Sequence, residues 1–385
     1  MPSLRIRPEA PPILEEWYRR HLSSAVHDIS SSGVQPYSFA EIRRLCGIRQ
    51  QDLDGLVMDD SVSQGGEGIR QAIADRYCGG DADRVMATHG SSEAIALTLA
   101  TLLRAGDRVV VQEGIYHSLG HYPRAAGCQV ETLPLAAVQD GEVAPETLRE
   151  VITPGTAALI VNFPHNPSGV SLSEKGLHAL LTRLDEVGAV LVWDGAMAEV
   201  AHRWEVLPDP ATLYERTVSY GTFSKTLGLP GLRVGWCVAP PELLRATFPL
   251  RDRTTLFLSP LVELIAARAM RAADQLVGRR AAQAGRNLAH LTTWAEEHRD
   301  FVRWTRPDGG VCGVLEVEDP AAPDAARTVE DFCRRLLAEH GTLLVPGSAF
   351  GVPHGVRLGF GGAEEEFRAG LERLSSFLRA TGRRR

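Results

Sequence analysis

Two uninterrupted apolar runs limit what this chain can fold into. Residues 157–162 read AALIVN and residues 189–193 read AVLVW, so neither run alternates apolar with polar side chains. Strands of this kind are buried on both faces, as in parallel sheets that carry helices on each side. From about residue 65 to residue 240 such runs alternate with helix-like segments. Those helices are expected at residues 91–103 and 176–186, and further strands at residues 107–112, 129–133, 217–220 and 234–238. The pattern predicts an α/β domain with a mostly parallel sheet.

The pattern changes after Pro260. Residues 261–299 are typical of long helix with few breaks. Short strands then alternate with helices: strands are expected at residues 311–317, 343–345 and 356–360, and helices at residues 329–340 and 364–379. We therefore expect a large domain at residues 51–265 and a smaller α+β domain at residues 266–385. Residues 1–50 are expected to form a segment that packs on the small domain.

Composition argues against several classes of protein. The 385 residues carry a net charge of −7 and no long basic block, which argues against nucleic-acid binding. The six cysteines lack both the close pairing of a zinc site and the density of a disulfide scaffold, so we expect reduced thiols and no metal. No apolar run is long enough to span a bilayer, and residues 1–12 lack the apolar core of a signal peptide. The cytoplasm is the expected location.

Polar segments follow the predicted strands, at the edge where open α/β sheets bind their ligands. In the segment THGSSE (88–93), Ser91 and Ser92 are placed to cap a long helix. Free N–H groups and the helix dipole would also favour a phosphate there, although an ordinary helix cap has the same sequence. In the loop NFPHNPSG (162–169), two prolines and a glycine are expected to hold the amide of Asn166 in one direction.

A carboxylate, Asp194, directly follows the strand expected at residues 189–193. In that position it could hold a protonated ring nitrogen, which would keep the ring electron-withdrawing. A helix cap is the simpler interpretation of the same residue.

Lysine is almost absent from the chain, and this draws attention to Lys225. Only two of the 41 basic residues are lysine. Lys175 lies in a segment typical of the start of a surface helix, whereas Lys225 lies in GTFSK (221–225), between hydroxyl side chains and after an expected strand. A lysine so placed can form a Schiff base with a carbonyl cofactor. Arg233, a few residues later, could pair with a phosphate through two hydrogen bonds.

In this order and spacing, these residues resemble the fold type I family of pyridoxal 5'-phosphate (PLP) enzymes, the aspartate aminotransferase superfamily. The resemblance runs from about Asp28 to Phe360 and implies a homodimer that holds PLP on Lys225. It also implies roles for the other residues. Asp194 pairs with the pyridine nitrogen, Asn166 bonds the ring oxygen, Tyr116 stacks on the ring, Ser91, Ser92, Thr222 and Arg233 hold the phosphate, Arg357 binds the substrate α-carboxylate, and Gly33 covers it.

Two departures separate the chain from ordinary members of that superfamily. Met197 stands where many relatives carry a tyrosine, and residues 58–70 lack the tyrosine that reaches the partner subunit's phosphate. A closer resemblance is to capreomycidine synthases and the cyclases of the streptolidine branch of streptothricin biosynthesis. It rests on the segments at residues 28–34, 88–94, 116–118, 162–169, 193–195 and 228–237. It implies PLP-dependent dehydration and ring closure of 3-hydroxyarginine or 3,4-dihydroxyarginine, which yields a capreomycidine-type amino acid for antibiotic biosynthesis.

Two parts of that chemistry stay open at the level of sequence. Loss of a β-hydroxyl needs an acid, and His117, beside Tyr116, or Lys225 itself could supply it; a packed loop histidine is an equally good interpretation of His117. The guanidine must be held by a carboxylate or by carbonyls. The candidate carboxylates are Asp28, Asp59, Asp60 and Glu67.

Three other functions compete with this interpretation. An ordinary class I or II aminotransferase would use the same cofactor residues. A non-catalytic regulator with this fold would usually carry a separate DNA-binding region, and none is evident. A nucleotide-binding dehydrogenase would need a Gly-x-Gly-x-x-Gly turn after a strand, which GGEG (65–68) matches poorly.

Overall fold

One lobe of the molecule is built on a seven-stranded sheet with the order β2-β10-β9-β8-β7-β3-β4. The structure is a computed structural model that describes residues 10–317 and 328–382. β10 runs antiparallel to both of its neighbours, and the remaining pairs are parallel, so the predicted mostly parallel sheet is confirmed. The strands are β2 (Val85–Thr88), β3 (Arg108–Gln112), β4 (Gln129–Leu133), β7 (Thr156–Asn162), β8 (Val190–Asp194), β9 (Thr217–Thr222) and β10 (Gly235–Val238).

Alternate residues of the central strands enter two separate hydrophobic clusters. In β7, Leu159 packs in a cluster with Leu177 of α8 (Glu174–Val187), whereas Ile160 packs in another with Ile95 of α5 (Ser91–Leu102). Helices therefore bury both faces of the sheet, which is why its strands are continuously apolar. The other helices of this lobe are α4 (Glu67–Tyr77), α6 (His117–Ala125), α7 (Pro145–Val151) and α9 (Pro241–Arg251), and a short hairpin joins β5 (Val138–Gln139) to β6 (Glu142–Val143).

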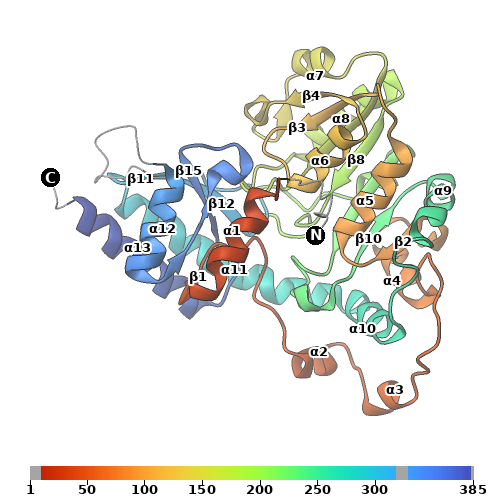
Figure 1. Cartoon of the computed structure of the whole chain (residues 1–385), viewed down its shortest axis with the longest axis horizontal. Helices are drawn as coiled ribbons and strands as arrows, with labels where there is room; N and C mark the ends of the chain where they lie inside the picture. The colour runs from red at the N-terminus through yellow and green to blue at the C-terminus, as the bar shows by residue number, and fades with distance from the viewer. Residues whose placement is uncertain (1–9, 318–327, 383–385) are drawn as a thin grey trace, which may run out of the picture.

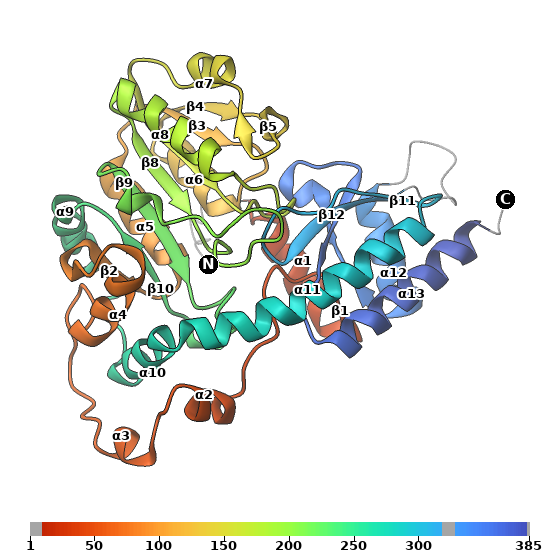
Figure 2. The same cartoon turned by 180° about the vertical axis from the view of Figure 1, so that it is seen from behind.

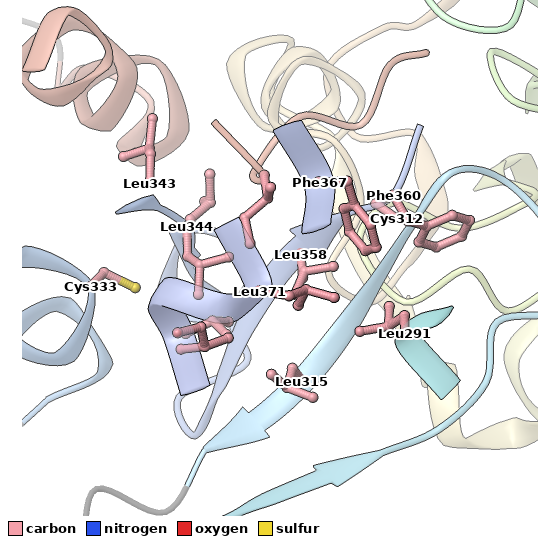
Figure 3. Close-up of a cluster of buried hydrophobic side chains, with 14 of the residues drawn as sticks. Leu291, Cys312, Leu315, Cys333, Leu343, Leu344, Leu358, Phe360, Phe367 and Leu371 are labelled. Atoms are coloured by element: carbon pink, nitrogen blue, oxygen red, sulfur yellow. The ribbon is translucent and has the colours of Figure 1, made fainter. Parts of the chain in front are cut away.

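The second lobe contains a four-stranded antiparallel sheet with the order β11-β12-β15-β14. Its core packs Leu315 and Leu358 of the sheet against Leu291, Phe367 and Leu371 of the surrounding helices (Figure 3). The predicted α+β character of the C-terminal region is thus confirmed. The elements are β11 (Val302–Trp304), β12 (Cys312–Val317), α12 (Val329–His340), β14 (Val345–Pro346), β15 (Gly355–Gly359) and α13 (Glu364–Gly382).

Two consecutive helices connect the lobes. The expected long helical region is divided into α10 (Pro260–Arg271) and α11 (Ala273–Glu297) at Ala272, whose φ of −100° and ψ of 14° interrupt the helix. α10 packs on α4, and α11 continues to the second lobe (Figure 2). The domain boundaries at residues 50 and 265 stay predictions.

The N-terminal segment contacts both lobes. α1 (Ile13–His21) lies between them in Figure 1, and the indole of its Trp17 donates a 2.9 Å hydrogen bond to the carbonyl of Leu344. The strand β1 (His27–Asp28) pairs in parallel with β13 (Thr342–Leu343) of the second lobe. α2 (Phe39–Leu45) instead buries Ile42 in the cluster formed by α4 and α10, and α3 (Gln50–Asp54) follows it.

Candidate active site

A cavity of about 600 Å³ lies at the carboxyl edge of the seven-stranded sheet. β7 and β8 end there side by side, with Asn162 in register with Asp194, and Lys225 follows β9 in the next turn. The other side of the cavity is formed by helix α1, the segment around Ser32, and Arg357 from β15. Two faces built from distant parts of the chain therefore meet around one space.

The first turn of α5 faces the cavity with exposed hydrogen-bond donors. The expected cap by Ser91 or Ser92 is wrong: Gly90 occupies the N-cap with a φ of 76°, no side chain caps the helix, and both serines line the cavity instead. A glycine is required at position 235 because a Cβ there would lie 2.3 Å from the amide nitrogen of Ser91. This close approach brings the helix N-terminus to the strand edge, where its N–H groups favour an anion.

Arg233 adds a positive charge to the same corner. Its Nη1 donates to the hydroxyl of Ser224 at 3.2 Å and to the carbonyl of Pro230 at 3.0 Å. A Cβ on Gly90 would lie 3.0 Å from Arg233 Nη2, so the guanidinium is packed against the start of α5. Together with Thr222, which also lines the cavity, these groups form a site suited to a phosphate.

The loop after β7 is pinned to the neighbouring strand. Asn162 Nδ2 donates to the carbonyl of Asp194 at 2.9 Å, and the backbone N–H of Asn166 donates to Asn162 Oδ1 at 2.8 Å. The side-chain oxygen of Asn166 accepts from Arg357 Nη1 at 3.1 Å. Its amide nitrogen is therefore the group left to donate to an acceptor in the cavity.

Asp194 is the last residue of β8 and lies at the floor of the cavity. Its Oδ1 accepts from the backbone N–H of Ala196 at 3.0 Å, and the residue is 5 % exposed. Burial raises the pKa of this carboxyl to about 6, against smaller lowering effects from that hydrogen bond and from Lys225. A positive charge on a bound ring would stabilise the carboxylate and relieve this cost.

Lys225 points its amine at the N-terminal segment. Its Nζ donates a 2.8 Å hydrogen bond to the hydroxyl of Ser32. Burial, followed by the charge of Arg357, lowers the pKa of the amine to about 8. A lysine in such a site is uncharged far more often than a surface lysine, so it can act as a nucleophile and a base.

Arg357 is 2 % exposed and held on three sides. Its Nε donates to the carbonyl of Ser30 at 3.0 Å, and its Nη2 donates to the hydroxyl of Tyr18 at 2.7 Å. The third partner is Asn166, described above. A guanidinium fixed in this way presents a positive charge with little freedom to move, as a binding group for a carboxylate should.

Most of the predicted site residues meet at this cavity. Those that line it are Ser91, Ser92, Tyr116, Asn166, Asp194, Thr222, Lys225, Arg233 and Arg357. Gly33 lies just behind the lining residue Ser32, and a Cβ on it would approach the carbonyl of Ser224 to 3.4 Å. The roles of these residues in binding and catalysis stay predictions.

His117 and the carboxylates expected to hold guanidine are distributed differently. His117 does not line the cavity; its Nε2 lies 3.3 Å from Glu15 Oε1, and Glu15 does. Of the four candidate carboxylates, Asp28 lines the cavity and Asp59, Asp60 and Glu67 do not. Met197, at the position where many relatives have tyrosine, lines the cavity as well.

Sequence reasoning missed several residues that line the cavity, among them Glu15, Tyr18 and Ser32. Glu15 and Tyr18 come from α1, and Ser32 contacts Lys225 directly. The only signal for the first two was their spacing of three residues on a helix, which places them on one face. That spacing says nothing about what the face contacts.

The residues present fit PLP. The glycine-lined α5 terminus and Arg233 suit its phosphate, Asp194 suits its ring nitrogen, the free amide of Asn166 suits its ring oxygen, and Lys225 suits its aldehyde. A mostly parallel seven-stranded sheet with this site at its carboxyl edge, joined to a small α+β lobe, is the fold of the fold type I PLP enzymes.

Comparison with known sequences defines the family. Residues 63–374 match the family of class I and II aminotransferases, and the chain belongs to it. Over 382 residues it is 41 % identical to capreomycidine synthase of Streptomyces vinaceus, covering 98 % of this chain and 96 % of that protein. It is also 29 % identical to the arginine–pyruvate transaminase AruH of Pseudomonas aeruginosa, over 81 % of this chain and 80 % of that one.

A solved structure shows the same likeness. The crystal structure of the PLP-dependent cyclase OrfR superposes with a TM-score of 0.95 at 69 % identity, covering 98 % of this chain and 99 % of that one. Within residues 10–317 and 328–382, no helix has the length and apolar character needed to cross a membrane.

Proposed function

We propose that this protein is a PLP-dependent cyclase that dehydrates a β-hydroxylated arginine and closes it into a capreomycidine-type amino acid for antibiotic biosynthesis. One observation carries the proposal: the likeness to the cyclase OrfR extends over nearly the whole chain, including both faces of the cavity. The similarity to capreomycidine synthase supports the same class of substrate.

Bound PLP would supply an electron sink that makes the α-proton of an amino acid acidic. The chain's own residues would do the rest. The N-terminus of α5, with Arg233 and Thr222, holds the phosphate end. Asp194 keeps a proton on the ring nitrogen, because that carboxyl is buried and gains from an adjacent positive charge. Asn166 donates its amide to the ring oxygen.

Arg357 and Lys225 act on the substrate. Arg357 binds the α-carboxylate and so fixes the α-carbon relative to Lys225. Lys225 takes the α-proton, for which its lowered pKa suits it at mildly alkaline pH. Ser32, which accepts the hydrogen bond of Nζ, sets the direction of the amine.

The net reaction loses one water from the substrate. The α-proton and the β-hydroxyl leave as water. A guanidine nitrogen then bonds to the β-carbon and gives up one of its protons, and a proton returns to the α-carbon. Because hydroxide is a poor leaving group, the β-hydroxyl needs a proton as it departs. We propose the protonated Lys225 amine or His117 as its donor.

The test is product analysis from 3-hydroxyarginine and 3,4-dihydroxyarginine, run side by side without a keto acid. Mass spectrometry should show loss of one water, and NMR should show a new bond between the β-carbon and a guanidine nitrogen. Amino transfer that depends on an added keto acid, with no cyclic product, would overturn the proposal.

An aminotransferase acting on an amino acid and a keto acid is the second candidate. The similarity to an arginine–pyruvate transaminase is the observation that favours it. Both reactions use the same cofactor residues, so the two functions are separated by the requirement for a keto acid.

We further propose that the protein is a cytoplasmic homodimer. Apolar side chains that face solvent gather on two segments: Val57, Met58 and Val62 on one, Leu256 and Leu261 on the other. Hydrogen bonds from Ser61 and Gly66 to Glu263 hold these segments together. Light scattering after gel filtration should give twice the mass of the chain; the mass of a single chain would contradict the dimer.

A further inference from the structure

A cationic substrate faces an electrostatic obstacle in this cavity. Lys225, Arg233 and Arg357 all line it, so a guanidinium needs a carboxylate within contact distance. Three carboxylates line the cavity, namely Glu15, Asp28 and Asp194. Which of them is available can be judged from what each already contacts.

Two of the three are committed elsewhere. Asp194 lies at the floor of the cavity, at the place suited to the ring nitrogen. Asp28 Oδ1 accepts hydrogen bonds from the backbone N–H of Ser30 at 2.9 Å and from its hydroxyl at 2.6 Å. These contacts hold the turn that carries Ser30, whose carbonyl in turn binds Arg357. Asp28 is thus part of the support for the carboxylate-binding arginine. Both contacts fall on Oδ1, and among the described residues no donor reaches Oδ2, so it is this supporting role, and not a lack of free oxygen, that separates Asp28 from Glu15.

Glu15 is placed differently. Its side chain is 45 % exposed, and its Oε1 lies 3.3 Å from His117 Nε2. Among residues 10–317 and 328–382, no group donates to its Oε2. The hydrogen bond with His117 lowers the pKa of Glu15 against the opposing effect of burial, and the charges of Lys225 and Arg357 lower it further. Glu15 is therefore ionised at neutral pH and has an oxygen free to accept.

Helix α1 relates Glu15 to the binding point for the α-carboxylate. Tyr18, three residues after Glu15, contacts Arg357 through its hydroxyl. Three residues of helix advance about 4.5 Å along the axis and return nearly to the same face. One helix can then contact both ends of an amino acid as long as arginine. Tyr18 acts at the carboxylate through Arg357, and Glu15 acts at the distal end.

We propose that Glu15 binds the guanidinium of the substrate and that His117 is the positioning residue that holds its carboxylate. The assignment rests on the proposed function for its substrate class. It makes α1 the element that selects an amino acid with a cationic end. His117 is itself oriented by contact with the Tyr116 ring, at 4.2 Å between ring centroids, and by the hydroxyl of Ser118.

The test compares binding of two ligands of nearly equal shape to the holoenzyme. L-arginine carries the cationic guanidinium and L-citrulline a neutral urea, and neither has a β-hydroxyl to eliminate. Calorimetry on the wild type, Glu15→Gln and Glu16→Gln gives the ratio of the two dissociation constants. Glu16 is the matched control, since it lies next on α1 but pairs with Arg19 and Arg20 instead of lining the cavity.

Glu15→Gln should weaken arginine binding about 10- to 100-fold and leave citrulline binding nearly unchanged, because one charged hydrogen-bonding partner is lost. Glu16→Gln should keep the wild-type ratio. Glu15→Asp, which keeps the charge, provides a second variant if Glu15→Gln is unstable, and should retain part of the preference for arginine.

An unchanged ratio in Glu15→Gln would overturn the assignment, as would a loss of the ratio in Asp28→Asn alone. The proposed function is tested separately, by measuring the cyclisation of 3-hydroxyarginine by the wild type. Binding that depends on Glu15 without cyclisation would contradict the function and leave the guanidinium site standing.

Discussion

The two faces of the cavity differ in how they are built and in what they do. The sheet face carries Asp194 at the end of β8, with Asn166 and Lys225 just after β7 and β9. Asp194 and Asn166 are buried and engaged in hydrogen bonds of the backbone N–H groups, whereas Lys225 is half-buried and donates to the hydroxyl of Ser32. The α1 face carries Glu15 and Tyr18 on a nine-residue helix, and Glu15 stays partly exposed. In the proposed function, bond-breaking chemistry belongs to the sheet face and recognition of the substrate to the α1 face.

Among substitutions on the sheet face, the loss of Lys225 should lower turnover the most. Lys225→Ala is expected to remove the yellow colour of the lysine-bound cofactor and to lower turnover by about 10⁴-fold, since both the attachment point and the base are lost. Absorbance and kcat measure this. Lys175→Ala is the control, because that side chain is 79 % exposed and, within the part of the chain that the structure describes, its amine pairs with Glu142 alone. Retained colour and turnover in Lys225→Ala would contradict the whole assignment.

Asp194→Asn should give the second-largest loss of turnover. The amide keeps the shape of the side chain but cannot balance a charged ring nitrogen, so kcat is expected to fall about 10²- to 10³-fold while the cofactor remains bound. Single-turnover kinetics with the cofactor at saturation would measure it. A variant with wild-type kcat would show that the sheet face does not tune the cofactor through this carboxyl.

The pH dependence of stability tests the buried amine itself. The pKa of Lys225 is depressed to about 8, so between that pH and its usual value near 10.5 the unfolded chain binds a proton that the folded chain does not. Stability should therefore rise with pH through this window. In the cofactor-free protein, Lys225→Met should stabilise the fold by about 3 kcal/mol below pH 8, with the gain fading toward pH 10.5.

Urea unfolding at a series of pH values measures this difference. Lys175→Met is the control for replacing a lysine by methionine at an exposed side chain. A gain independent of pH would mean that packing, and not the charge of Lys225, is responsible.

His117→Ala tests whether His117 acts in substrate binding, by holding Glu15, or in catalysis, as the acid that protonates the leaving hydroxyl. If His117 holds Glu15, KM for the hydroxyarginine should rise, by up to about 10-fold for the loss of one charged hydrogen bond, with kcat nearly unchanged. A fall in kcat of about 10²-fold or more would instead support the acid role. Steady-state kinetics with both substrates separates the outcomes.

Tyr18→Phe should give the smallest effect. It removes one of three hydrogen-bond partners of Arg357, so KM should rise about fivefold with kcat retained. The melting temperature of the variant is the control for α1 packing. An effect on kcat larger than that on KM would show that α1 also orients the reacting atoms.

The sequence predicts the residues of the sheet face better than those of the α1 face. Asn166, Asp194 and Lys225 lie at or just after the carboxyl ends of parallel strands, so local pattern places them at one edge. Arg233 instead precedes β10, and it reaches the same edge because β10 runs antiparallel to its neighbours. Glu15 approaches the same cavity only because α1 packs between the lobes, and that contact is a tertiary one with no local signature.

Two local expectations failed or were incomplete for physical reasons. The serines at 91 and 92 were expected to cap α5, but Gly90 takes the cap. Its φ of 76° favours glycine, and a Cβ there would lie 3.0 Å from Arg233 Nη2. The boundary between α10 and α11 falls at Ala272, a good helix former, and nothing in the local sequence explains why the helix is interrupted there.

The scarcity of lysine gives the protein an unusual response to amine-directed reagents. Besides the amino terminus, the chain offers two primary amines, and Lys175 near the start of α8 is the accessible one. A dye or a solid support coupled through that side chain would attach at one defined point. The described residues of that helix do not line the cavity. Every molecule so tethered would present the same orientation and keep its chemistry intact.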